Sequence, residues 1–246
     1  FGYGMVMASG CGNKTLVRIG GGNLKSLVVF IVLGISAFAT MKGITAVLRT
    51  QTLDTVFLDM PSGAGLHALG IPGVGYLVAL AILVWVLKDK GFWSVNSGLA
   101  GVGVGGIVAA MWWVSGHLGF VPEHPETLDA VYLATSSGRI EALNFVAPIA
   151  NTLDWLMFYS DASKVLTTGI LAVVGVICGS AASALHSQTF RWESFADARD
   201  LGQHLMGSVL MGVGGVTAMG CTVGQGLSGI STLSLNAVLA VVAIVL

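Results

Sequence analysis

Two of the three cysteines in this 246-residue chain follow a glycine in closely matching surroundings. Superposing Cys11 on Cys221 aligns three glycine pairs as well: Gly2 with Gly212, Gly4 with Gly214 and Gly10 with Gly220. A thiol offers a soft S–H donor, and it forms transient sulfur bonds where its pKa is lowered. We therefore expect two related turns, at opposite ends of the chain, that each supply half of one site.

The residues that follow Cys221 add polar groups to this predicted site. Glycine costs a helix about 1 kcal/mol per position relative to alanine, so the stretch 220–226 is a poor helix former. An interrupted helix exposes backbone amides, which together with the side chains of Thr222 and Gln225 make a favourable site for an anion. The candidate substrate-binding residues are therefore Gly10, Cys11, Gly220, Cys221, Thr222 and Gln225.

The third cysteine and the histidines carry a weaker prediction. Cys178, in the run Ile177-Cys178-Gly179-Ser180, is expected to be a small packing residue and is kept as a secondary substrate-binding candidate. The cysteines form neither a CxxC pair nor a zinc pattern, and no two histidines have metal-ligand spacing. The sequence therefore predicts no metal site, no catalytic residue and no cofactor.

Composition places the chain in a membrane. It is 54% hydrophobic and only 9% charged, with a mean hydropathy of +0.86, which leaves too little polar surface to cover a soluble globule. Its long apolar runs rich in Gly, Ala, Val and Leu are typical of closely packed helices and lack the alternation of barrel strands. The expected fold is an all-α polytopic membrane protein, and a net charge of −1 without basic clusters argues against a nucleic-acid partner.

Apolar segments long enough to cross or enter a bilayer define the expected elements. They are 24–48, 73–87, 98–120, 164–185, 201–219 and 232–246. The run 143–159 is interrupted by polar residues and predicts a surface-lying or half-inserted helix, whereas the glycines of 98–106 predict a face on which a neighbouring helix packs closely. Because the chain opens on an apolar residue other than Met and ends without a polar tail, we expect further residues at both ends.

Charges set the expected orientation. Lysine and arginine gather before residue 24, at 88–90 and at 191–199, whereas 121–162 is acidic. The positive-inside rule then places the basic loops in the cytoplasm, so the segments that lead into the two cysteines run in opposite directions. This predicts one transmembrane domain of two inverted halves, approximately 1–120 and 121–246, with broken helices meeting near the midplane. A competing alignment pairs Gly103–Gly106 with Gly212–Gly215, in parallel and without a first cysteine.

Three stretches together resemble the YeeE/YedE family of bacterial sulfur transporters. The most specific is Gly220-Cys221-Thr222-Val223-Gly224-Gln225-Gly226-Leu227-Ser228-Gly229. A second, Ser9-Gly10-Cys11-Gly12-Asn13-Lys14-Thr15-Leu16-Val17-Arg18 followed by Gly22-Asn23-Leu24, is similar to the first cysteine motif of that family but carries Asn13-Lys14 where small residues are expected. The third is Phe190-Arg191-Trp192-Glu193.

The resemblance implies a multi-pass protein of the bacterial inner membrane that takes up thiosulfate or a related sulfur-containing anion. It implies that Cys11 and Cys221 pass the anion along a central path by S–H···S hydrogen bonds. It also implies membrane lipid and a TusA-like cytoplasmic sulfur-carrier protein as partners. Two other functions stay open on the residues: a membrane thiol or persulfide redox protein, and a structural membrane subunit that does not transport.

Overall fold

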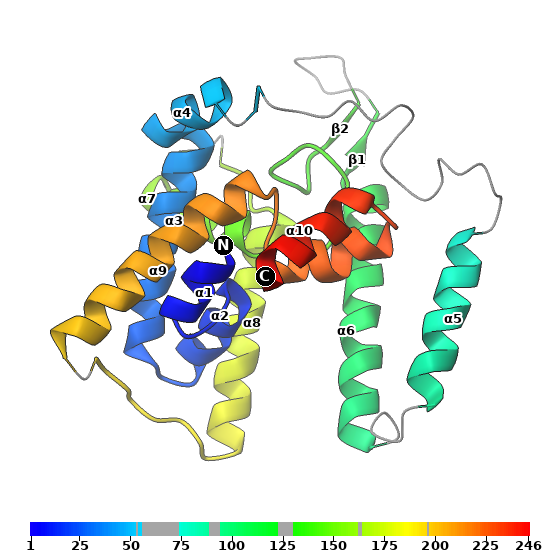
Figure 1. Cartoon of the computed structure of the whole chain (residues 1–246), viewed down its shortest axis with the longest axis horizontal. Coiled ribbons are helices and arrows are strands. Elements are labelled where there is room, and N and C mark those ends of the chain that lie inside the picture. Colours follow the sequence, from blue (N-terminus) through cyan, green and yellow to red (C-terminus); the bar gives the residue numbers. More distant parts are fainter. Residues whose placement is uncertain (53, 56–73, 89–93, 123–129, 162–163, 196) are drawn as a thin grey trace.

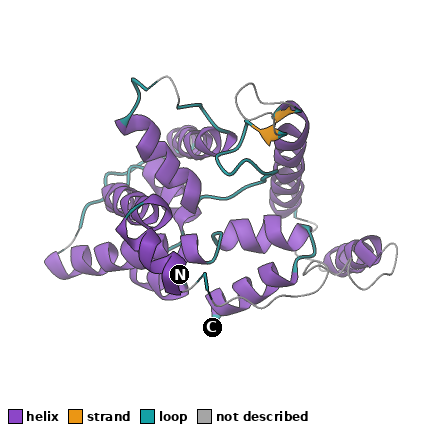
Figure 2. Ribbon diagram, turned by 90° about the horizontal axis from the view of Figure 1, so that it is seen from above, coloured by secondary structure: helices purple, strands orange, loops and turns teal. Residues whose placement is uncertain are grey.

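The computed structural model describes residues 1–246 with the exception of 53, 56–73, 89–93, 123–129, 162–163 and 196. The described helices are α1 (Gly2–Met7), α2 (Gly12–Gly20), α3 (Leu24–Lys42), α4 (Ile44–Thr52), α5 (Val74–Lys88), α6 (Val95–Trp113), the π-helical η3 (Val114–Leu118), α7 (Val146–Met157), α8 (Thr168–His186), α9 (Ala198–Thr217), the π-helical η4 (Gly224–Gly229) and α10 (Leu235–Val245). Strand β1 (Phe120–Val121) pairs antiparallel with β2 (Val131–Tyr132). Helices dominate the fold (Figure 2), so the predicted all-α class is confirmed.

Three of the described helices are long and apolar enough to cross a membrane: α3, α6 continued by η3, and α8. Each of α3 and α8 has 19 residues and is therefore about 28 Å long at 1.5 Å per residue, close to the roughly 30 Å of a hydrocarbon core. Helices α5 and α10 are apolar but shorter. Length and composition thus support a membrane protein, as predicted.

Small polar residues start the long helices. The Asn23 carboxamide oxygen accepts a hydrogen bond from the Ser26 amide at 2.9 Å, and Asp197 does the same for Asp200 at 2.7 Å. Such caps satisfy amides that the first helical turn leaves unpaired. At its other end α3 stops at Lys42, because Gly43 adopts extended backbone and α4 follows as a separate helix. The predicted span 24–48 was therefore too long.

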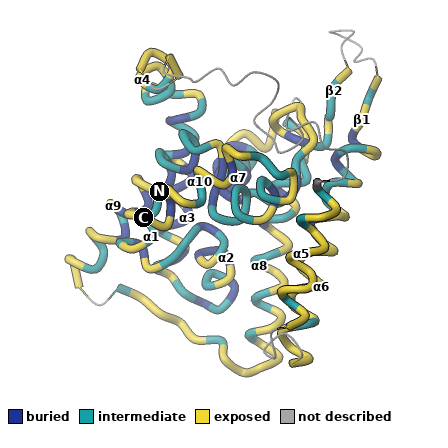
Figure 3. Tube along the Cα trace, turned by 45° about the vertical axis from the view of Figure 1, so that its right-hand side comes forward, coloured by how far each residue is buried: buried dark blue, intermediate teal, exposed yellow. Residues whose placement is uncertain are grey.

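The buried core lies between α3, α7 and α9 (Figure 3). Leu33 of α3, Ile149 of α7 and Met211 of α9 are completely buried in it. Of the two alternatives predicted for 143–159, the surface-lying helix is wrong, since half of the 12 residues of α7 are buried in this core. The half-inserted helix stays a prediction. The polar interruptions of α7 do not expose it, because the hydroxyl of Thr152 donates to Pro148 O at 2.7 Å and Asp154 pairs with Lys164.

Helices α5 and α6 stand to one side of this core (Figure 1). A methyl group added to Gly103, Gly105 or Gly106 would meet no atom within 4 Å among the described residues. The prediction of close helix packing on these glycines is therefore wrong for this structure. The competing alignment also loses support, because Gly103–Gly106 lie inside a continuous helix and no turn follows them before η3.

Candidate functional site

The two glycine–cysteine sequences form turns with the same backbone hydrogen bond. The amide of Gly10 donates to Met5 O at 2.9 Å, and the amide of Gly220 donates to Gly215 O at 2.9 Å. Each bond spans five residues and closes the C-terminal end of a helix, α1 in one case and α9 in the other. The likeness found in the sequence thus corresponds to a likeness in the backbone.

The residues just before each cysteine share an unusual conformation. Ser9 and Met219 both have positive φ, at 58° and 52°. A residue with a side chain adopts this left-handed region at a cost of about 1 kcal/mol, so its occurrence at the same place in both turns is informative. Each cysteine then precedes a new helix: Cys11 caps α2, and Cys221 precedes the helical stretch 222–231.

The two thiols lie near each other. Cys221 is 1% exposed, and its sulfur accepts a hydrogen bond from the Gly224 amide at 3.3 Å. The backbone of Phe145 also acts on this sulfur, and Cys11 is near enough to interact with it electrostatically. Cys11 itself is half-buried. The structure therefore brings together two cysteines that are more than 200 residues apart in the chain.

Three helices begin at these two sulfurs. Helix α2 starts after Cys11, the stretch 222–231 starts after Cys221, and α7 starts after Phe145. The N-termini of α2 and α7 approach each other, since a methyl group on Gly12 would lie 3.6 Å from Ile149 Cδ1. A helix N-terminus carries unpaired amides and about half a positive charge, which suits an anion. Basic side chains lie at the first turn as well, since the Arg18 guanidinium donates to Ser9 O at 3.2 Å and Lys14 packs against Gly10.

Glycines let the two helices that lead into the turns cross at close range. A methyl group on Gly4 of α1 would lie 2.8 Å from Met211 N, and one on Gly214 of α9 would lie 2.6 Å from Phe1 N. Both contacts are with backbone, so a side chain at either glycine would force the helices apart. As residue numbers rise along α1, those of its partners in α9 fall. The two helices therefore run antiparallel at their crossing.

The predicted polar ligands have different positions. Gln225 donates from Nε2 to Ala218 O at 2.8 Å, so its amide group closes the second turn. Thr222 is half-buried at the first position of the helix after Cys221. Gly10 and Gly220 lie in the turns themselves.

Sequence reasoning missed the segment before α7. Ser228 of η4 donates to Leu143 O at 2.8 Å, and a methyl group on Gly224 would lie 3.1 Å from Asn144 Oδ1. These contacts hold the residues before α7 against the helix that follows Cys221. The asparagine within an apolar run was the sequence feature that could have indicated this role.

Cys178 lies apart from the other two cysteines. It is exposed on α8, so within the described residues it does not have the buried position expected of a small packing residue. The structure gives it no part in the paired site.

The stretch 190–193 is held against the turn between α2 and α3. The Arg191 amide donates to Gly21 O at 3.1 Å, and the Leu24 amide donates to Glu193 O at 2.9 Å. Gly22 has φ of 94°, and a methyl group there would lie 2.6 Å from Arg191 O. This motif therefore fixes the turn that precedes α3.

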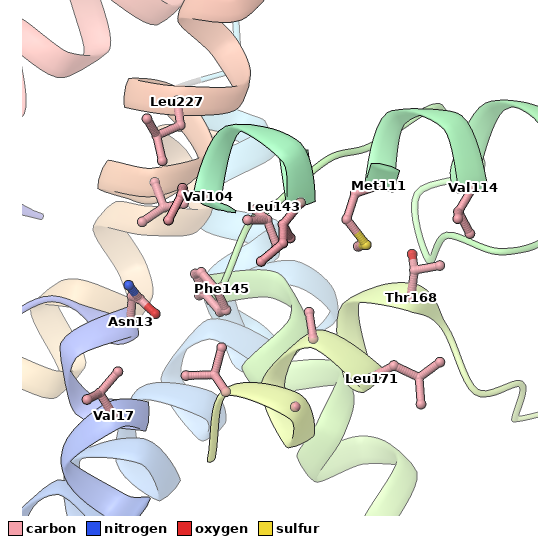
Figure 4. A pocket seen from close by; sticks show the side chains of 15 residues that line it. Asn13, Val17, Val104, Met111, Val114, Leu143, Phe145, Thr168, Leu171 and Leu227 are labelled. Carbon is pink, nitrogen blue, oxygen red and sulfur yellow. The ribbon is translucent and has the colours of Figure 1, made fainter. Parts of the chain in front are cut away.

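Two cavities flank the helix that follows Cys221. A cavity of about 620 Å³ is lined almost entirely by apolar side chains of α2, α6, α8 and η4, among them Val104 and Leu227, with Asn13 supplying polar atoms (Figure 4). A smaller cavity of about 200 Å³ is bordered by Gln225 and Ser228 on the opposite flank. The smaller, more polar cavity fits a small anion better than the large apolar one.

The long apolar helices and the two glycine–cysteine turns define an all-α membrane protein with interrupted helices. The whole chain, residues 1–246, matches the model of the sulphur transport family (YeeE/YedE), and it belongs to that family. It is 30% identical to the "Thiosulfate transporter TsuA" of Escherichia coli (strain K12) over 236 residues, which cover 92% of this chain and 64% of that protein. It is 25% identical to the protein of the same name from Spirochaeta thermophila over 259 residues, covering 98% and 70%. The chain thus spans about two thirds of the length of these relatives.

Proposed function

We propose that this protein takes up thiosulfate or a related sulfur-containing anion, along a path on which Cys11 and Cys221 lie. The observation that carries the proposal is the meeting of both thiols with three helix N-termini. Amides at helix N-termini replace the water that a bound anion loses, and a thiol donates a hydrogen bond without adding negative charge. The names of the relatives in the sulphur transport family agree with this substrate class.

The path is formed by two inverted halves. Beyond the matching turns, equivalent helix contacts support this part of the proposal. Gly212 of α9 packs against the Leu33 carbonyl of α3, and Gly2 of α1 packs against the Ile244 carbonyl of α10. The contact of α1 with α10 therefore corresponds to the contact of α9 with α3. Helix α1 also runs antiparallel to α9. The halves correspond approximately to residues 1–120 and 121–246.

In the proposed mechanism the anion enters from the side of the acidic stretch 121–162. It loses water at a constriction beside the two cysteines. It accepts hydrogen bonds from the thiols and from the helix amides, passes Cys221 and Cys11, and leaves on the basic side. No bond is made or broken, so both cysteines end each passage as thiols. The protein lies in the bacterial inner membrane with its basic loops in the cytoplasm. A TusA-like carrier at that face is an expectation drawn from the family resemblance.

Uptake of labelled thiosulfate by cells that depend on this protein tests the proposal. Cys221→Ala and Cys11→Ala are expected to reduce uptake at least about 100-fold, because each removes a donor at a constriction where water cannot replace it. Cys178→Ala is the matched control and is expected to keep full uptake. Wild-type uptake in both single variants would overturn the proposed path.

The same variants separate transport from thiol redox chemistry. A redox protein would form a disulfide or a persulfide on Cys11 or Cys221 during turnover, whereas the proposed passage leaves both thiols free. Intact mass measurement after exposure to thiosulfate distinguishes the two. A stoichiometric sulfur adduct on the wild-type chain that is absent from the variants without uptake would favour the redox function.

A further inference from the structure

A second polar site lies at the far end of α7 from the cysteines. A depression of about 530 Å³ is formed where α3 ends, where the segment after β2 turns, and where α7 ends. Its polar lining includes Lys42, Ser136, Ser137, Asn151, Asp154 and Lys164. Its volume is many times the ~30 Å³ share of one water molecule, so a small hydrated anion fits.

The charges in this depression leave one ammonium group available. Lys164 Nζ pairs with the carboxylate of Asp154, which is 8% exposed. Lys42 forms no ion pair within the part of the chain that the structure describes. Lysine at the last position of an apolar helix is ordinarily an interfacial anchor, but here the side chain also borders a polar hollow. The charged side chains of the lining, two lysines and one aspartate, therefore carry a net positive charge.

The hydroxyl groups beside Lys42 are arranged as donors. Ser136 Oγ accepts a hydrogen bond from Asn151 Nδ2 at 2.8 Å, and Ser137 Oγ accepts one from the Arg139 amide at 3.3 Å. Neither hydroxyl donates a hydrogen bond within the part of the chain that the structure describes, so each O–H can donate to a ligand. An ammonium group next to hydroxyl donors is well suited to an oxyanion.

Helix α7 links this depression to the paired cysteines. Its N-terminus begins at Phe145, beside Cys221, and Asp154 lies in its last turn. At 1.5 Å per residue the two ends of this link are about 14 Å apart along the helix. The depression is on the side of the acidic stretch 121–162, which the charge distribution places outside the cytoplasm.

We propose that the depression bordered by Lys42 and Lys164 is an entrance site that recruits a divalent sulfur oxyanion before it reaches the cysteines. The anion binds Lys42 and the serine hydroxyls, and it competes with Asp154 for Lys164. A depression with a net positive charge concentrates anions near the protein. This inference rests on the proposed transport function and deepens it.

Binding is measured by titrating sodium thiosulfate into the purified full chain in phosphatidylcholine nanodiscs. Trp155 lines the depression, so its fluorescence reports occupancy, and Trp155→Phe supplies the background. Lys42→Gln is expected to weaken binding roughly five- to tenfold, the usual effect of losing one charged hydrogen bond. Lys88→Gln, an exposed lysine at the end of α5, is the charge-matched control and is expected to leave the affinity unchanged.

Asp154→Asn gives the sharper result. It frees Lys164 and removes a competing negative charge, so thiosulfate should bind about fivefold more tightly. A purely structural role of the Asp154–Lys164 pair predicts no gain in affinity. Unchanged affinity in Lys42→Gln, or no gain in affinity in Asp154→Asn, would overturn the entrance site.

Uptake kinetics keep this inference separate from the proposed function. Lys42→Gln is expected to raise the KM for thiosulfate by the same factor and to leave the maximal rate unchanged, because Lys42 acts before the constriction. An unchanged KM, with uptake still lost in Cys221→Ala, would overturn the entrance site and leave the cysteine path standing. A wild-type chain that binds thiosulfate but does not transport it would overturn the path and leave the entrance site standing.

Discussion

The two glycine–cysteine turns share a backbone conformation but lead into different segments. After Cys11 the chain forms the regular helix α2 and reaches Asn23, the cap of α3. After Cys221 it contains the π-helical η4 and reaches Ser234, the cap of α10, in a stretch that is one residue longer. A π-helical turn is the usual way for a helix to hold one extra residue. The extra residue is thus accommodated in η4, and the glycine–cysteine turn and the next capped helix keep their relation.

The turns differ in exposure as well. Cys221 is buried and its turn is closed by the Gln225 side chain. Cys11 is half-buried, and its carbonyl accepts a hydrogen bond from the Thr15 hydroxyl at 3.1 Å. The comparison indicates that a repeated turn can supply two unequal positions on one path, a tight one at Cys221 and a more open one at Cys11.

The largest expected effect comes from separating the two turns. Gly4→Ala places a methyl group against Met211 N and Gly207 O at the crossing of α1 and α9. We expect a loss of about 3 kcal/mol in the free energy of unfolding, since backbone cannot move aside as a side chain can. Thermal or denaturant unfolding in detergent measures it.

Gly105→Ala on α6 is the matched control for that substitution. Its added methyl group meets open space, so helix propensity should make the variant equally or slightly more stable. Equal destabilisation by both variants would mean that the crossing of α1 and α9 is not what holds the turns together.

Thiol labelling tests the unequal exposure of the two cysteines. In a Cys178→Ala background, a chain that retains Cys11 should react with a water-soluble maleimide at least about ten times faster than one that retains Cys221, because reaction needs an accessible thiolate. Mass spectrometry follows the rate. Thiosulfate should slow the labelling of Cys11, and equal rates would remove the distinction between an open and a tight position.

The smallest expected effect concerns the strained residue of each turn. Ser9→Gly and Met219→Gly should each raise the free energy of unfolding by up to about 1 kcal/mol, because glycine adopts positive φ without a steric cost. Ala100→Gly, within α6, should lower it by about 1 kcal/mol. A gain at one turn and a loss at the other would show that their backbones are not equivalent in solution.

Local features of the chain were predictable from its sequence. The spans of α3, α6 and α8 follow from long apolar runs, and the two turns follow from glycine and cysteine at matching positions. The position of α7 was not predictable in this way. Its polar residues predicted a surface-lying or half-inserted helix, but Asp154 pairs with Lys164, a residue outside the helix. A polar residue in an apolar run therefore indicates an ion-pair or hydrogen-bond partner elsewhere in the chain as readily as it indicates exposure to solvent.

The sequence by itself determined the membrane class and the two matching turns, because hydropathy and backbone conformation depend on residues close together in the chain. Only the tertiary structure decided that the sulfurs of Cys11 and Cys221 lie near each other beside the start of α7. That meeting depends on the antiparallel crossing of α1 and α9, where glycines allow backbone to touch backbone. Contacts between segments more than 200 residues apart leave no periodic pattern in either segment, so the site is visible only once the helices are packed.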